Sequence, residues 1–209
     1  MAPTIHRAMG CVVIDDFLSG MSRLSGLSSF LASKGMRVQT PKPAGAGELL
    51  SALQDALQAA RSGTGGASAV ACGTGCGAAL ALAEQLPVER LALIDPRPPR
   101  RAAGSCADGA LYRRSVRLDR FARRNLALCV SDMLVIGARQ AGPGCPQPAF
   151  MGAGRFHGRL LSVEFCGGDA NNLYTDCENV LKNGVYSFLQ NGDFPKSLAE
   201  KSEMCIIYG

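Results

Sequence analysis

The chain has 209 residues, of which 47% are hydrophobic and 19% are charged, and its mean hydropathy is +0.09. This length and composition predict one globular domain, spanning residues 1–209, and they exclude a disordered chain. No apolar run reaches the roughly 18 residues that cross a bilayer. The N-terminus has no signal-peptide pattern, so we expect no membrane partner.

The nine cysteines and two histidines of the chain limit the metal sites and disulfides that it could form. The cysteines are scattered without the paired spacing of a zinc site, and several fall within predicted strands. This pattern favours reduced, buried thiols and therefore a cytoplasmic location. Cys72 and Cys76 are the one close pair, which is weak evidence for a ligand set. We expect neither a metal nor a cofactor.

The net charge of +5 is concentrated in one segment. Nine arginines and only two aspartates lie between Arg97 and Arg124. Such a cluster attracts phosphate, acyl-CoA or nucleic acid through its field. It equally suits a solvated helix face whose arginine stems cover apolar surface. Because no nucleic-acid motif accompanies it, we do not expect a nucleic-acid partner.

In chain order, the first predicted element is a buried strand at residues 11–14. Apolar residues at helical spacing then predict a helix that ends at Gly35. A second strand is predicted at residues 36–40. An amphipathic helix at 49–60 leads into the glycine-rich stretch 62–66.

Strands and helices continue to alternate through the rest of the chain. The further predicted elements are a strand at 68–72, a helix at 77–86, strands at 91–95, 133–137 and 160–165, and a last helix at 177–189. Residues 4–8 and 204–208 could add edge strands. The alternation predicts an α/β fold with a mostly parallel sheet of about six to eight strands and helices on both faces.

The turn Gly73-Thr74-Gly75-Cys76-Gly77 joins a predicted strand to a predicted helix. One interpretation is the dinucleotide fingerprint G-x-G-x-x-A, with Asp95 ending the next strand to meet a ribose hydroxyl. That motif normally follows the first strand of its fold, whereas here two strands precede it. A nucleotide or CoA binder using the Gly73–Ala78 turn therefore stays an alternative.

Five segments together resemble the α/β-hydrolase superfamily of esterases and lipases in their order and spacing. They are Val12–Gly20, Gly35–Gly45, the turn with its following strand Leu91–Pro96, Met133–Gly137 and Asn171–Val180. The resemblance runs from about residue 11 to 190. It implies a three-layer α/β-hydrolase-like sandwich with a minimal cap, the basic segment 96–125 taking the place of a lid. It also implies hydrolysis of carboxylic esters by a Ser-Asp-His triad.

The triad positions implied by the resemblance carry no catalytic groups. The serine position falls on Gly75, or on Thr74 if the turn is shifted back by one residue. The acid position falls on Ala138 and the histidine position on Asn171. Asp15 and Asp16 replace the family's His-Gly, and their charge opposes an oxyanion. The chain is thus expected to be a pseudoenzyme that binds a small molecule or a protein, with a homodimer possible. Its expected cleft comprises Asp15, Asp16, Phe17, Gly73, Thr74, Gly75 and Asn171.

The alternative from the same resemblance is an active esterase-type hydrolase with a different nucleophile. Thr74 and Cys76 are the candidates, and His157 and Asp169 could serve as base and acid. The branched Cβ of Thr74 is disfavoured in a strained turn. Cys76 lies one residue beyond the expected apex of the turn.

Overall fold

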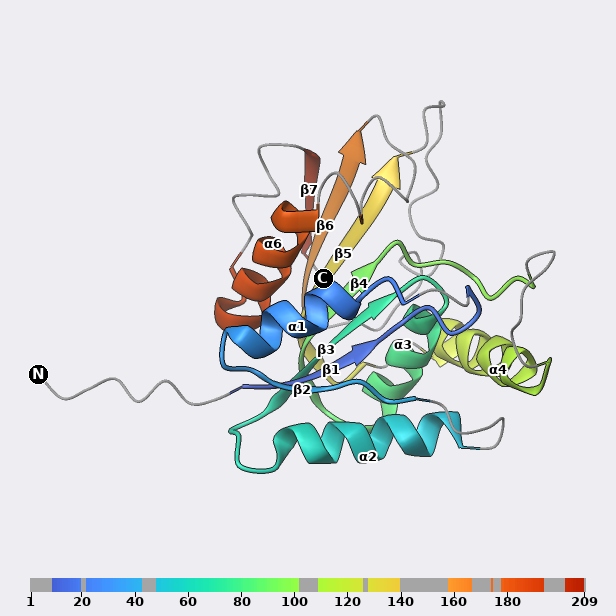
Figure 1. Cartoon of the computed structure of the whole chain (residues 1–209). Coiled ribbons are helices and arrows are strands. Elements are labelled where there is room, and N and C mark those ends of the chain that lie inside the picture. The colour runs from blue at the N-terminus through green and yellow to red at the C-terminus, as the bar shows by residue number, and fades with distance from the viewer. Residues whose placement is uncertain are drawn as a thin grey trace, which may run out of the picture.

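A computed structural model describes residues 9–19, 22–42, 48–101, 109–125, 128–139, 158–166, 174, 178–193 and 202–208. Figure 1 shows a central sheet with helices packed on both sides. The strands are β1 (Gly10–Ile14), β2 (Arg37–Gln39), β3 (Ala67–Cys72), β4 (Val88–Ile94), β5 (Val130–Arg139), β6 (Arg159–Cys166) and β7 (Ser202–Tyr208). The helices are α1 (Ser25–Ser33), α2 (Leu49–Arg61), α3 (Gly75–Gln85), α4 (Gly109–Asn125) and α6 (Glu178–Asn191).

The seven strands form one sheet in the order β2-β1-β3-β4-β5-β6-β7. Strands β1 to β6 all run parallel, and β7 pairs antiparallel with β6. The prediction of a mostly parallel sheet of six to eight strands is confirmed. The strand suggested at 204–208 is present as β7, while the one suggested at 4–8 lies outside the described residues.

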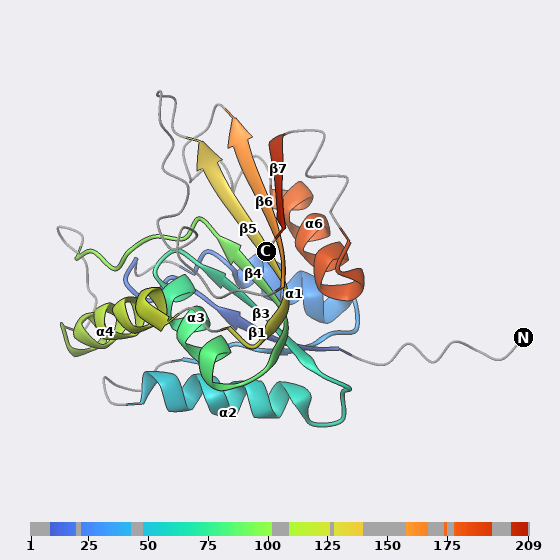
Figure 2. The ribbon, with the colours of Figure 1, turned by 180° about the vertical axis from the view of Figure 1, so that it is seen from behind.

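Each face of the sheet carries its own hydrophobic core, as expected for parallel strands that are buried on both sides. Val12 and Ile14 of β1 face the core beneath α2 and α3. Cys11 and Val13 of the same strand face the core beneath α1 and α6. Figures 1 and 2 show these helix pairs from the two sides of the sheet.

Helix α3 is the most enclosed helix of the described part of the chain. Its small residues from Gly75 to Ala83 are all buried, because β-strands cover one side and α4 covers the other. At Gly77 an added Cβ would lie only 2.9 Å from the Cβ of Asp119 in α4. The glycine therefore permits the close approach of the two helices. The prediction had α3 begin at residue 77, two residues later than it does.

The basic segment contains the long helix α4, which packs on α3 at the outer edge of the molecule (Figure 1). Its buried side chains include Leu118 and Ala122. Residues 109–125 of this arginine-rich segment therefore form a helix, as the helix-face interpretation predicted. In the described part of the chain, no helix is long and apolar enough to span a bilayer.

Candidate functional site

Three loops meet at the carboxyl edge of the sheet, where ligands usually bind in parallel α/β folds. Ile14, Cys72 and Ile94 end β1, β3 and β4, which are neighbours in the sheet. Backbone hydrogen bonds join the loops: Gly73 N donates to Ile94 O (3.0 Å), and Arg97 N donates to Gly73 O (3.1 Å). The turn after β3 is therefore fixed to the end of β4 and the loop that follows it.

Gly73 is the residue of this turn with a left-handed backbone. Its φ is +54°, a left-handed conformation that disfavours residues with a side chain. An added Cβ would lie 2.5 Å from Oδ2 of Asp16 and 2.7 Å from its Cγ. The left-handed backbone favours glycine at position 73, and a side chain there would require the Asp16 carboxylate to move.

Gly75 lies in the first turn of α3 and faces the end of β1. An added Cβ would lie 2.5 Å from the carbonyl oxygen of Asp15 and 2.9 Å from that of Ile14. Because both neighbours are backbone atoms, position 75 has no room for a side chain. Gly75, which was predicted at the apex of the turn, therefore lies in the packed junction between α3 and β1.

Thr74 and Asp16 form the closest polar pair of the turn. The Thr74 hydroxyl donates to Oδ1 of Asp16 at 2.6 Å, and both residues are buried. The backbone N–H of Leu18 donates to the same carboxylate oxygen at 3.3 Å. The expected cleft residues Asp16, Gly73 and Thr74 are thus brought together.

Asp15 holds the loop between β1 and α1. Its Oδ1 accepts hydrogen bonds from the backbone of Asp16 (2.9 Å) and Arg23 (3.0 Å), and its Oδ2 accepts from the hydroxyl of Ser22 (2.7 Å). The backbone of Leu24, just before α1, donates to Oδ2 at 3.3 Å. A carboxylate at the start of a helix satisfies its free N–H groups and complements its dipole. Asp15 therefore fixes the conformation of the loop that carries Asp16.

The two cysteines of the turn lie in the cores on opposite faces of the sheet. The thiol of Cys72 donates to Oδ1 of Asp15 at 3.2 Å, and burial followed by the charge of Asp15 raises its pKa. Burial likewise raises the pKa of Cys76, whose thiol donates to Ile94 O at 3.7 Å. Since the thiolate is the reactive form, neither environment activates the sulfur.

Two charged residues of the loop after β4 complete this edge. Asp95 has a φ of +48°, and its Oδ2 lies 2.5 Å from Nη2 of Arg97. Burial raises the pKa of Asp95, while the Arg97 guanidinium opposes that shift. The sequence marked Asp95 as the end of a strand but gave no pattern for its pairing with Arg97.

Arg23 and Tyr174 were not predicted as site residues. The Arg23 guanidinium carbon lies 5.3 Å from the centre of the Tyr174 ring, within range of a cation–π interaction. Nη1 of Arg23 and the hydroxyl oxygen of Tyr174 are buried, and neither has a hydrogen-bond partner among the described residues. Only the three-dimensional structure brings these two polar groups, 151 positions apart, together.

The remaining predicted site residues are less fully defined. Phe17 packs against the core beneath α2 and α3. Ala138 lies in β5, and only its backbone is described. His157, Asp169 and Asn171 lie outside the described residues. Within the described ranges, no cluster of three or more His, Cys, Asp or Glu residues could hold a metal ion.

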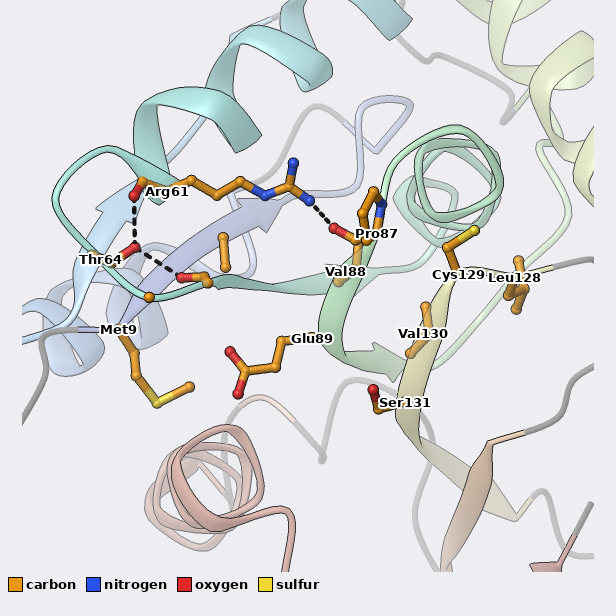
Figure 3. A pocket seen from close by; sticks show the side chains of 13 residues that line it. Met9, Arg61, Thr64, Pro87, Val88, Glu89, Leu128, Cys129, Val130 and Ser131 are labelled. Atoms are coloured by element: carbon orange, nitrogen blue, oxygen red, sulfur yellow. Dashed lines mark hydrogen bonds between the residues drawn. The ribbon is translucent and has the colours of Figure 1, made fainter.

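An open pocket of about 950 Å³ lies at the opposite end of the sheet, by the amino ends of β3, β4 and β5 (Figure 3). The Arg61 guanidinium donates to the Pro87 carbonyl at its wall. Its lining residues include Met9, Thr64, Val88, Glu89, Leu128, Cys129, Val130 and Ser131. The lining pairs no nucleophile with a base, and we therefore retain the carboxyl edge as the candidate site.

No protein-family model matches the chain, and no curated protein matches it in sequence. Solved structures do match its fold. Est1E from Butyrivibrio proteoclasticus superposes with a TM-score of 0.65 at 14% identity, covering 91% of each chain. The chain therefore has the α/β-hydrolase fold, as the resemblance implied.

Two further structures give the same result. The esterase domain of a Rhodothermus marinus protein superposes with a TM-score of 0.54 at 15% identity, covering 89% of this chain and 88% of that one. The NocB thioesterase domain, solved as a covalent complex with a fluorophosphonate nocardicin G analog, gives 0.53 at 13% identity, with coverages of 88% and 95%.

Proposed function

We propose that this α/β-hydrolase-fold protein binds a small molecule at the carboxyl edge of its sheet and does not hydrolyse esters. The observation that carries the proposal is the contact between Gly73 and Asp16. In an active hydrolase of this fold, the nucleophile stands on the strained turn between strand and helix. Gly73 has the left-handed backbone of this turn, so we place the apex at Gly73, two positions before Gly75.

The charge at this position supports a binding role. The Asp16 carboxylate lies where the first atom of a nucleophilic side chain would stand. Acyl transfer develops negative charge on the substrate oxygen, and a carboxylate nearby destabilises that charge. The same argument counts against a nucleotide or CoA phosphate at the Gly73–Ala78 turn.

The polar groups around the turn support a ligand with both donors and acceptors. Nη1 of Arg23 and the hydroxyl of Tyr174 are buried, and the described part of the chain gives them no hydrogen-bond partner, which is costly unless water or a ligand satisfies them. Asp95 and Asp16 supply carboxylate oxygens at the same edge. These groups favour a zwitterionic small molecule. Cytoplasmic location remains part of the proposal and is supported by the buried thiols of Cys11, Cys72 and Cys76.

One observation favours the competing function of an active hydrolase. The 2.6 Å hydrogen bond from Thr74 to Asp16 gives a hydroxyl beside a carboxylate that could accept its proton. In that reaction Thr74 Oγ1 would bond to the ester carbonyl carbon, the alkoxide would leave, and water would release the acid. Thr74 is only 7% exposed, so a substrate would need to reach a nearly covered oxygen.

Ester turnover and covalent labelling separate the two functions. The protein would be assayed with p-nitrophenyl esters and with a fluorophosphonate probe. We expect the protein to hydrolyse the esters no faster than a Thr74→Val variant does. We also expect that the probe labels neither protein. Every protein in the series should carry Cys129→Ser, because the Cys129 thiol is exposed and would react with activated esters. Saturable turnover that Thr74→Val abolishes and Thr74→Ser keeps would establish the hydrolase instead.

Binding itself needs a positive test. Thermal-shift titration with a panel of amino acids, amines and small carboxylates should raise the melting temperature for at least one compound. The shift should weaken in Arg23→Gln, which removes the guanidinium but keeps much of the side chain. Lys34→Gln is the matched control, because Lys34 is an exposed cation at the C-terminal end of α1, which leads to the amino end of β2 and so to the opposite edge of the sheet. If every shift survives in Arg23→Gln, the ligand does not bind at this edge.

A further inference from the structure

The outward face of α4 carries a straight stripe of arginines. Arg113, Arg117, Arg120 and Arg124 are exposed, and they follow one another at intervals of four, three and four residues. At 3.6 residues per turn, these positions fall within about 60° of the helix circumference. They stand opposite the buried side chains Leu118 and Ala122. The stripe extends roughly 17 Å along the helix.

The described part of the chain leaves this stripe without charge partners. None of the ion pairs found among the described residues includes any of the four arginines. Asp119, the one acidic residue of the helix, is buried and turned toward Gly77 of α3. Four neighbouring like charges repel one another, so their free energy falls when an anionic surface approaches.

An apolar side chain lies beside the stripe. Phe121 is 42% exposed, and it is the only large hydrophobic side chain that is exposed among the described residues. It is four residues after Arg117 and three before Arg124, so it borders both. Figure 1 shows α4 at the outer edge of the molecule.

We propose that the outward face of α4 binds an acidic helical segment of a partner protein. Carboxylates spaced three and four residues apart on a helix repeat at the same intervals as the four arginines, so each guanidinium meets one carboxylate. An apolar residue of the partner packs against Phe121. The four arginines form a straight row, which suits a rod-like helix better than a flat membrane. A duplex backbone would curve away from a straight row of charges.

Binding of designed peptides tests the proposal. The probe is a fluorescent helical peptide with glutamates at positions i, i+4, i+7 and i+11 and one leucine beside them. An isomer with the same composition distributes its glutamates around the helix. Fluorescence anisotropy at low salt should show tighter binding of the first peptide. No binding of it, or equal binding of both, would overturn the proposal.

Charge reversal locates the surface. Arg117→Glu combined with Arg120→Glu should weaken binding about tenfold or more, because two attractive contacts become repulsive. Lys34→Glu combined with Arg37→Glu is the matched control, since both cations are exposed and lie at the end of α1 and in β2, whereas α4 packs on α3. The control should change the affinity less than threefold. An equal loss in both variants would mean that only net charge matters, and would overturn the assignment.

Two further measurements complete the test. Phe121→Ala should weaken the peptide about threefold, and circular dichroism should show that every variant keeps its fold. If Arg117→Glu with Arg120→Glu loses the fold, Arg113→Gln with Arg124→Gln takes its place. Duplex DNA or vesicles of anionic lipid that bind more tightly than the glutamate peptide at equal salt would also overturn it. The surface is tested without the ligand site, so either proposal can fail alone.

Discussion

At the scale of single residues, the turn after β3 is defined by what two glycines exclude. Gly73 accommodates a left-handed backbone beside the carboxylate of Asp16, and Gly75 accommodates the main chain of β1. The sequence showed the glycines but not their different roles. A side chain at either position collides, with a carboxylate in one case and with backbone carbonyls in the other.

Gly75→Ala should therefore destabilise the protein strongly. The new methyl group would overlap the Asp15 and Ile14 carbonyls, and overpacking of this kind costs about 2–3 kcal/mol. Urea unfolding followed by circular dichroism measures the loss. Gly137→Ala is the control, because a Cβ added there meets nothing within 4 Å. Equal stability of the two variants would contradict the packing described for α3 against β1.

Asp95 gives a prediction about pH. Burial raises its pKa in the folded protein, so the folded state holds this proton more tightly than the unfolded state does. The stability contributed by the protonated carboxyl is present below the unfolded pKa of about 3.8 and is lost as pH rises through the raised pKa. Asparagine tolerates a positive φ and does not titrate here. The stability of Asp95→Asn relative to the wild type should therefore increase as the pH rises from 4 to 7.

Urea midpoints at several pH values check this prediction. Asp55→Asn is the matched control, since Asp55 is an exposed aspartate of α2. Its stability difference from the wild type should stay level over the same pH range. If the Asp95→Asn difference stays level as well, the attraction of Arg97 offsets the burial of Asp95.

At the scale of elements, the C-terminus of α6 is fixed by side chains from the sheet. Arg90 of β4 donates to the carbonyls of Leu189 (2.6 Å) and Gln190 (3.2 Å), and Arg159 of β6 donates to that of Gly192. Cationic donors satisfy the free carbonyls of a helix end and complement its dipole. Asp132 of β5 lies between them and accepts from Arg159 at 3.0 Å. Three strands thus hold one helix end.

Arg90→Ala should loosen this end of α6. Two carbonyls would lose a charged donor, and hydrogen bonds of this kind contribute about 1.5–3 kcal/mol each. We expect a loss of about 2 kcal/mol in urea unfolding, because water replaces part of the interaction. Hydrogen exchange should rise in residues 185–191. Arg120→Ala, at an exposed position of α4, should change the stability by less than about 0.5 kcal/mol.

At the scale of the whole molecule, the sheet separates two cores that depend on each other through the same strands. Phe188 is fully buried in the core beneath α1 and α6, and Leu53 is fully buried in the core beneath α2 and α3. In β1, β3, β4, β5 and β6, residues on one face of the strand contribute to one core and residues on the other face contribute to the second core. The two sides should therefore unfold together.

Phe188→Ala should cost about 3–5 kcal/mol, because it leaves a cavity in a packed interior. Leu53→Ala should cost about 2–5 kcal/mol on the other side of the sheet. Each variant should unfold in a single transition with the same midpoint by circular dichroism and fluorescence. Phe121→Ala, at the exposed position, is the control and should be near neutral. Two separate transitions in either core variant would show that the cores unfold independently.

The sheet was predictable because its strands are buried on both faces and read as apolar runs, as in residues 11–14 and 68–72. The turn was found from its glycines, but its register was not. Which glycine is strained depends on the approach of Asp16 and β1, and spacing alone does not encode that approach. Arg23 and Tyr174 come together only through the tertiary fold.

The contact between Asp16 and Gly73 restricts which mutations can give this turn a side chain. A serine at position 73 collides with the carboxylate of Asp16, so that substitution alone brings a clash and a strained backbone. Shortening Asp16 alone leaves Thr74 without its hydrogen-bond partner and gains no nucleophile. Only the two changes together remove the clash, and the backbone strain of a non-glycine residue at position 73 remains. A hydroxyl at the apex therefore lies at least two coupled mutations away, and a search through single substitutions at position 73 or 16 would miss it.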